Sequence, residues 1–274
     1  MTKEMQKKEF KLFQELVYNR LGISLSDQKV SLLQSRLGKL VTKKNMSGYT
    51  ELYDYFVHNH GSSVDHELED AITTNVTSFF REKEQWIYLK EYVKTNLSTK
   101  NSKKLRIWSA ASSSGEEPYS IAIFLLENIP NVSNWDIKIL ATDISEDILK
   151  KAIKGIYAEK DMSGVPRHII QKYFTEKKDK NSKTYIVKDF IKKMITFRKY
   201  NLVYGNYTMF SNPLDMIFCR NVMIYFDKKV QTQINEKLTK LLQIDGLMLI
   251  GHSESIPPSV KNLKLVKSSI YTKQ

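Results

Sequence analysis

The sequence predicts an open α/β domain preceded by an all-helical region. Two observations predict the α/β domain. An apolar strand, a loop of small residues and an amphipathic helix follow one another between Leu105 and Leu126, and further apolar strands alternate with helices after them. A third observation predicts the helical region, because residues 1 to about 98 show only the apolar spacing of helices. The polar run TKNSKK, residues 99–104, is the expected boundary.

Composition limits the classes of protein that the chain can belong to. The 274 residues carry a net charge of +13, which favours an acidic partner but does not choose among nucleic acid, a membrane surface and an acidic protein. The charged N-terminus lacks the apolar stretch of a signal peptide, and no apolar run approaches the roughly 20 residues of a membrane helix. The single cysteine, Cys219, excludes an internal disulfide. We therefore expect a cytoplasmic protein without membrane insertion.

The second predicted helix, from about Asp27 to Lys44, carries a basic stripe beside its apolar face. Lys29, Arg36 and Lys43 are seven residues apart, so they share one side of the helix, and Lys39 borders them. Such a stripe suits an acidic helix as partner. The alternative is an ordinary solvated face.

The first strand of the α/β domain leads into a loop that suits a cationic ligand. Ser112, Ser113, Ser114 and Gly115 let the backbone turn tightly. Nucleotide-binding loops of this kind have three glycines, and their helix N-terminus binds pyrophosphate. Here Glu116 and Glu117 stand at the helix entrance and would repel phosphate. S-adenosylmethionine, with its sulfonium and ammonium groups, fits this loop.

The remaining elements continue the alternation. A second strand ends at Asp143, where such folds bind a ribose, and Ser145 can cap the next helix. Residues 155–193 interrupt the alternation and contain a predicted hairpin, Thr175 to Val187, so we expect an inserted β-subdomain. The later elements are strands at residues 195–200, 215–219 and 246–251, a helix at 228–242, and a closing pair of strands at 263–266 and 269–272.

The carboxyl ends of three predicted strands present residues 112–117, Asp143 and residues 220–221, and these ends face the ligand crevice of an open α/β sheet. Each group also has a structural explanation, such as helix capping or interaction with a helix dipole. No metal is expected, because His58, His60 and His66 lack acids or cysteines at a familiar ligand spacing.

Five motifs resemble one family. TTNVTSFFRE, WSAASSSGEEPYSIAI, LATDIS, DMIFCRNVMIYFD and GLMLIGHSES, in this order, are similar to the chemotaxis receptor glutamate methyltransferases, the CheR family. The resemblance covers nearly the whole chain. It implies a helical N-terminal domain (1–80), a helix and linker (81–104) and a class I Rossmann-like S-adenosylmethionine-dependent methyltransferase domain (105–274) with a β-subdomain at about 155–193. The implied reaction is methyl transfer to glutamate side chains in the cytoplasmic helices of chemoreceptors.

The resemblance also implies which residues form the sites. Arg81 and Tyr225 would lie near the transferred methyl group, and the basic second helix would bind the receptor through Lys29, Arg36, Lys39 and Lys43. The implied contacts to the cofactor are Asn75, Thr77, Arg81, Glu117, Asp143, Asn201, Leu202, Arg220 and Asn221.

Departures from the family pattern are few. Ser112 stands where alanine or cysteine is frequent, and Tyr200 where histidine is common. The segment Thr175–Tyr185 lacks the glycine-containing insertion of members that bind a C-terminal receptor pentapeptide, so no pentapeptide tether is expected. We further expect a monomer with neither a metal nor nucleic acid as partner.

Two alternatives remain at this stage. A methyltransferase of the same fold acting on nucleic acid would agree with the positive charge, but the strand that ends at Cys219 is followed by RNVMIYF rather than by an Asn/Asp-Pro-Pro-aromatic turn. The second alternative is a cofactor-binding module that has lost catalysis, and the intact residues Asn75, Arg81, Asp143 and Tyr225 argue against it.

Overall fold

The computed structural model describes residues 4–59, 61–97, 100–179 and 182–274. The chain forms two compact units: Met1–Thr74 with Tyr225–Val230, and Asn75–Ile224 with Gln231–Gln274. Residues 75–80, which the sequence groups with the helical domain, thus belong to the second unit. Part of the predicted linker (98–99) and the tip of the predicted hairpin (180–181) lie outside the described residues.

The described part of Met1–Thr74 folds into α-helices around an aromatic and aliphatic core. Phe13 is fully buried and packs edge-on against the rings of Tyr53 and Phe56 at centroid distances of 5.6 and 6.5 Å. Gly22 ends the first helix in a left-handed conformation (φ 74°), as its position in the sequence predicts. The helices are α1 (Lys7–Leu21), α2 (Val30–Lys43), α3 (Tyr49–His58) and α4 (Ser62–Ile72).

The segment Tyr225–Val230 joins this unit although it is far away along the chain. The Ser24 N–H donates to the Tyr225 carbonyl at 2.8 Å, and the Tyr18 hydroxyl donates to the Asp227 carboxylate at 2.8 Å. The helix α10 (Lys228–Leu241) begins inside this segment.

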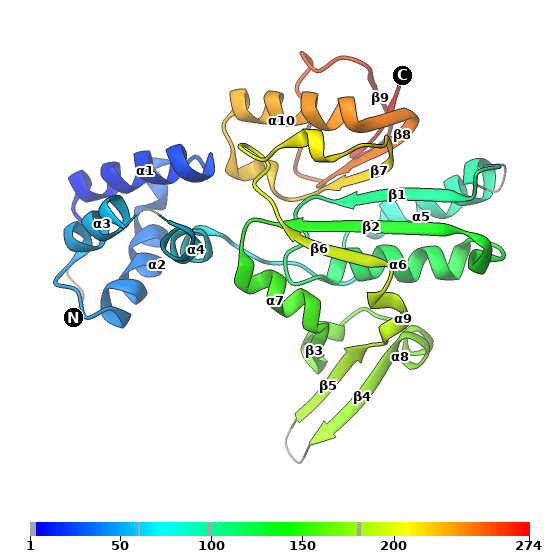
Figure 1. The fold of residues 1–274 in the computed structure, drawn as a ribbon, viewed down its shortest axis with the longest axis horizontal. Coiled ribbons are helices and arrows are strands. Elements are labelled where there is room, and N and C mark those ends of the chain that lie inside the picture. Colours follow the sequence, from blue (N-terminus) through cyan, green and yellow to red (C-terminus); the bar gives the residue numbers. More distant parts are fainter. Residues whose placement is uncertain (1–3, 60, 98–99, 180–181) are drawn as a thin grey trace. The chain divides into compact units, whose positions relative to one another are not determined.

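The second unit contains a seven-stranded sheet in the order β6-β2-β1-β7-β8-β10-β9 (Figure 1). Strands β6, β2, β1, β7 and β8 are parallel, and β10 runs antiparallel to both of its neighbours. Every residue of β7 is buried, as expected for a central strand of a parallel sheet. The strands are β1 (Lys104–Ser109), β2 (Asp136–Asp143), β6 (Ile195–Lys199), β7 (Leu214–Cys219), β8 (Leu242–Ile250), β9 (Leu263–Lys267) and β10 (Ile270–Lys273).

The chain order of the strands reverses at β1, because β2 lies on one side of it and β7 on the other. This is the switch point at which open α/β sheets bind ligands, at the carboxyl ends of the strands. Helices α6 (Glu116–Asn128) and α7 (Glu146–Lys154) pack against β2 and β6. Helix α5 (Lys83–Tyr92), continued by a π-helical turn (Val93–Leu97), inserts Trp86 against Phe124 and Phe218.

The predicted insertion is a separate three-stranded antiparallel sheet in the order β3-β5-β4. The hairpin predicted from Thr175 to Val187 corresponds to β4 and β5. Figure 1 shows these two strands as a long arm beside α8 and α9. The elements are β3 (Ile156–Ala158), α8 (Arg167–Tyr173), β4 (Phe174–Asp179), β5 (Ser182–Val187) and α9 (Asp189–Lys192).

Candidate active site at the carboxyl ends of the strands

The loop after β1 is tied to both neighbouring strands. The Ala110 N–H donates to the Phe218 carbonyl of β7, and the Ser112 N–H donates to the Thr142 carbonyl of β2, each at 2.8 Å. Ser113 and Gly115 adopt left-handed conformations (φ 48° and 99°), which produce the tight turn that the small residues predict. The loop therefore sits at the switch point of the sheet, where the sequence places a ligand.

Asp143 ends β2 with its carboxylate held against this loop. Its Oδ2 accepts the Ser113 N–H at 2.8 Å, and its Oδ1 accepts the Ser145 N–H at 3.1 Å. Ser145 in turn caps α7 by accepting the Ile148 N–H at 3.2 Å, as predicted. The structure thus brings Asp143 and the loop of residues 112–116 together.

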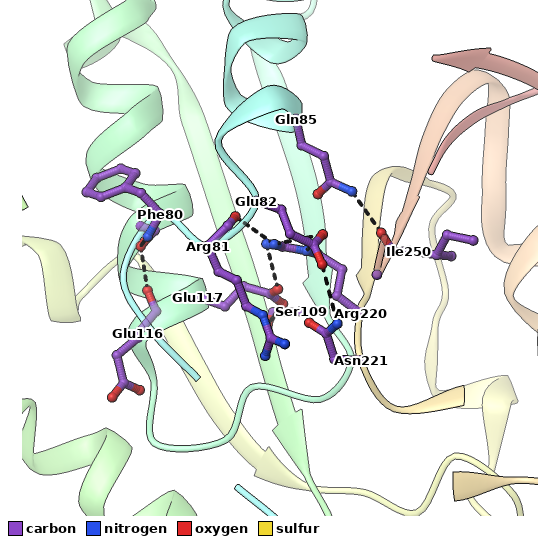
Figure 2. Close-up of polar contacts among 12 residues, drawn as sticks. Phe80, Arg81, Glu82, Gln85, Ser109, Glu116, Glu117, Arg220, Asn221 and Ile250 are labelled. Atoms are coloured by element: carbon purple, nitrogen blue, oxygen red, sulfur yellow. Dashed lines mark hydrogen bonds and ion pairs between the residues drawn. The ribbon is translucent and has the colours of Figure 1, made fainter. Parts of the chain in front are cut away.

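The guanidinium of Arg220 lies behind the loop and is almost fully buried, with 2% of its side chain exposed. It contacts Glu117 Oε2 at 3.2 Å and Glu82 Oε2 at 3.1 Å, and it donates to the Arg81 carbonyl at 2.6 Å. Figure 2 shows this carbonyl facing Arg220 while the Arg81 side chain extends away from it. Arg220 therefore links the strand end at β7 to the segment before α5.

The pKa values of Glu117 and Glu82, the two carboxylates that pair with Arg220, shift in opposite directions. Burial raises the pKa of Glu117 above its ordinary value, although Arg220 and the Ser109 hydroxyl, at 2.7 Å, oppose this shift. Burial also acts on Glu82, but Arg220 and the hydrogen bonds from the His252 N–H and the Asn221 amide lower the pKa of Glu82 below its usual range. Glu82 is thus held as an anion beside Arg220.

Asn221 follows Arg220 in a left-handed conformation (φ 57°). Its Nδ2 donates to Glu82 Oε1 at 3.3 Å, and its backbone N–H donates to Glu254 Oε2 at 2.8 Å. Glu254 also accepts the N–H groups of Met223 and Gly251. Sequence reasoning missed Glu82 and Glu254, although both lie inside the motifs FFRE and GHSES.

The segment before α5 contributes Asn75, Thr77 and Arg81. The Ser113 hydroxyl donates to the Asn75 carbonyl at 3.1 Å, and Arg81 Nη1 donates to the Val76 carbonyl at 3.0 Å. Asn75 and Thr77 line a cleft of about 340 Å³, together with Ser114, Glu116 and residues of α7 and β3. None of the other predicted cofactor contacts lines this cleft.

Asn201 and Leu202 follow β6, whose end is tied to β2 because the Tyr200 N–H donates to the Asp143 carbonyl at 2.9 Å. Asn201 Oδ1 accepts the N–H groups of Val203 and Tyr204 at 2.8 and 3.2 Å, so this side chain builds a turn. The Leu202 carbonyl accepts the Tyr207 hydroxyl at 2.7 Å.

The other predicted residues belong to the first unit. Tyr225 has the Lys29 ammonium 5.8 Å from its ring centroid. Arg36 is committed to structure, because its guanidinium donates to the Ile72 carbonyl and the Thr74 hydroxyl. Lys39 and Lys43 are exposed. The predicted stripe thus divides into Arg36, which holds the end of α4, the half-buried Lys29 just before α2, and the exposed Lys39 and Lys43.

Over the part of the chain that the structure describes, no group of three or more His, Cys, Asp or Glu side chains could hold a metal ion. His60, one of the three histidines considered above, lies outside that part. No described helix is long and apolar enough to cross a membrane.

Comparison with known proteins identifies the family of both units. A model described as "CheR methyltransferase, SAM binding domain" matches residues 75–272, and one described as "CheR methyltransferase, all-alpha domain" matches residues 8–73. A chemotaxis protein methyltransferase of Borreliella burgdorferi is 40% identical over 264 residues, covering 94% of this chain and 92% of the relative. One of Escherichia coli is 32% identical over 263 residues, covering 96% and 89%.

Proposed function

The chain belongs to the CheR methyltransferase family, and on that premise we propose that it transfers the methyl group of S-adenosylmethionine to glutamate side chains of chemoreceptors. The products are glutamate methyl esters and S-adenosylhomocysteine. One observation carries the proposal beyond family membership: two carboxylates, Glu82 and Glu117, pair with the buried guanidinium of Arg220 at the switch point of the sheet. This excess of negative charge suits a cationic ligand and disfavours a phosphate.

The residues present fit the cofactor. Asp143 would accept hydrogen bonds from the ribose hydroxyls, and its position is already set by Ser113 and Ser145. Asn201 and Leu202 would face the adenine end from the end of β6. Asn75, Thr77, Glu117 and Asn221 would hold the amino-acid end, with Arg220 supporting Glu117. The cofactor supplies an activated methyl group on a sulfonium.

Arg81 and Tyr225 are the proposed catalytic residues. The glutamate carboxylate is the nucleophile and is already ionised at pH 7, since its ordinary pKa is about 4.3. No side chain has to remove a proton, so the protein's tasks are orientation and exclusion of water. Arg81 can hold the carboxylate through a forked pair of hydrogen bonds, and Tyr225 can fix the geometry of transfer with its hydroxyl or ring.

The receptor would dock on α2. Lys39 and Lys43 are exposed on this helix and complement an acidic, glutamate-bearing receptor helix. Because Thr175–Tyr185 contains no glycine insertion, we propose that a receptor pentapeptide is not required. We also propose that the protein acts as a monomer without a metal.

Transfer of a tritiated methyl group tests the proposed function. The purified protein is incubated with labelled S-adenosylmethionine and either receptor-containing membranes or nucleic acid. We expect base-labile label, as methyl esters give, in the receptor fraction only. Label in nucleic acid would instead favour the alternative supported by the net charge of +13, and no transfer to either would favour a binding module.

A further inference from the structure

Two turns that contain left-handed residues meet at the site. Phe80 and Glu82, on either side of Arg81, have φ values of 51° and 62°, and Asn221 has a φ of 57°. Phenylalanine and glutamate rarely adopt this conformation, whereas asparagine adopts it more readily. One turn carries the proposed catalytic arginine, and the other carries a proposed cofactor contact.

The Glu82 carboxylate connects the two turns. Oε2 pairs with the Arg220 guanidinium at 3.1 Å, and that guanidinium also holds the Arg81 carbonyl. Oε1 accepts the Asn221 amide at 3.3 Å and the His252 N–H at 3.0 Å. Figure 2 shows Glu82 between Arg220 and Asn221. Only 9% of the Glu82 side chain is exposed, so water contributes little to these contacts.

The contact with Glu82 also fixes which way the Asn221 amide faces. A carboxylate accepts but does not donate, so the nitrogen of the amide must point toward Glu82. The amide oxygen then points away from Glu82 and is presented as an acceptor. The backbone of Asn221 cannot rotate freely to change this, because Glu254 holds its N–H at 2.8 Å.

We propose that Glu82 is a positioning residue that sets the Arg81 turn and the orientation of the Asn221 amide at the same time. This inference rests on the proposed function, because it assigns Glu82 a task in that reaction. Glu82 acts through Arg220 and Asn221. The group that Glu82 orients is the amide oxygen of Asn221. This oxygen can accept a hydrogen bond from an ammonium group, such as that in the amino-acid part of S-adenosylmethionine.

The variant Glu82→Gln tests the inference, with Glu84→Gln as matched control because Glu84 lies two residues further on and is exposed in the first turn of α5. A glutamine has the same shape but turns an N–H₂ group toward either Arg220 or Asn221. We expect the Kd of S-adenosylhomocysteine, measured by calorimetry, to rise roughly 10-fold or more, as for loss of a charged hydrogen bond. We also expect kcat to fall, while the KM for receptor stays unchanged. The Glu84→Gln control should match the parent protein in the Kd of S-adenosylhomocysteine, in kcat and in the KM for receptor.

Rescue separates positioning from simple structural support. Adding Asn221→Asp to Glu82→Gln restores a hydrogen bond between positions 82 and 221 with donor and acceptor exchanged, and keeps an outward acceptor oxygen. We expect the double variant to recover cofactor affinity relative to Glu82→Gln, whereas Asn221→Asp alone should lose affinity because two carboxylates then face each other. If Glu82→Gln does not fold, Glu82→Asp, which keeps the charge but shortens the side chain, should show the same loss.

Unchanged cofactor affinity and kcat in Glu82→Gln, or a double variant no better than Glu82→Gln, would overturn the inference. These outcomes differ from failure of the proposed function. In that case the parent protein itself would not methylate receptors, while the calorimetric comparison of Glu82→Gln with Glu84→Gln could still be read.

Discussion

At the scale of single residues, the Asp143 carboxylate has two tasks. It holds the loop after β1 through the Ser113 N–H and caps the turn before α7 through the Ser145 N–H. It is also the acid that we expect to bind the ribose. A test of ligand binding must therefore preserve the shape of the side chain as far as possible.

The variant Asp143→Asn meets this requirement. We expect it to weaken S-adenosylhomocysteine binding by roughly 10- to 150-fold, because a charged acceptor is lost. Calorimetry measures the affinity, and Asp147→Asn, an exposed acid on α7, serves as control. Equal affinities of the two variants would remove Asp143 from the site.

Hydrogen bonds hold both the backbone of Arg81 and one nitrogen of its side chain, since Nη1 donates to the Val76 carbonyl at 3.0 Å. The Arg81 carbonyl accepts hydrogen bonds from Arg220 and from the Trp86 indole at 2.6 and 2.9 Å. Arg81→Lys keeps the charge but loses the planar fork, so we expect kcat to fall at least roughly 10-fold. Arg198→Lys, at an exposed position of β6, should leave kcat unchanged. A lysine variant with full kcat would mean that charge alone suffices.

At the scale of elements, α2 supports its own unit and presents charge. Arg36 supports the unit by binding the end of α4, so reversing its charge would disturb the fold. The double variant Lys39→Glu with Lys43→Glu changes only the charge that α2 presents to solvent. We expect the KM for receptor to rise and the Kd for cofactor to stay constant, with parent activity falling as salt screens charges beyond about 8–10 Å.

The control for this pair is Lys8→Glu with Lys11→Glu on α1, where both lysines are exposed. It changes the net charge by the same amount. If both pairs raised the KM equally, long-range attraction rather than docking on α2 would explain the effect.

Position 115, in the loop between β1 and α6, needs a glycine for two reasons: its backbone is left-handed, and there is no space for a Cβ. The two reasons can be tested separately. Gly115 has φ +99°, and an added Cβ would lie 2.9 Å from the Tyr157 hydroxyl and 3.0 Å from the Ala152 Cβ. Gly164 has φ +86° with nothing within 4 Å. Gly164→Ala should therefore lower the free energy of unfolding by about 1–2 kcal/mol, as left-handed strain does. Gly115→Ala should lower it further in urea denaturation. Equal losses would show that the loop adapts to the added methyl group.

At the scale of the whole molecule, the pH dependence reports the mechanism. A glutamate substrate with a pKa of about 4.3 is fully ionised above pH 6, so we expect the single-turnover rate to be nearly flat from about pH 6 to 8.5. Rapid quenching with labelled cofactor measures it. A log-linear rise with slope near one across this range, abolished by replacing one side chain, would reveal a general base.

The sequence by itself determined most of the elements and their order, but not β3, α8 and α9 of the inserted subdomain. Apolar spacing predicts α1 to α4, the capping residue Ser145 predicts the start of α7, and the charged segment with a polar tip predicts the β4–β5 hairpin. These signals are local, since each needs only a few neighbouring residues. The family could also be recognised from sequence, because its motifs lie in register along the chain, and the comparisons confirm it.

The tertiary structure alone decided how the charged side chains are paired. Arg220 is 138 residues from Glu82 and 103 from Glu117 along the chain, and Arg36 is 36 residues from the Ile72 carbonyl that it binds. Periodicity does not show such partners, because it reports which face of an element is buried and not what meets it there. For the same reason, sequence reasoning overlooked Glu82. The energy of a buried charge depends on contacts that exist only once the strands and the segment before α5 are brought together.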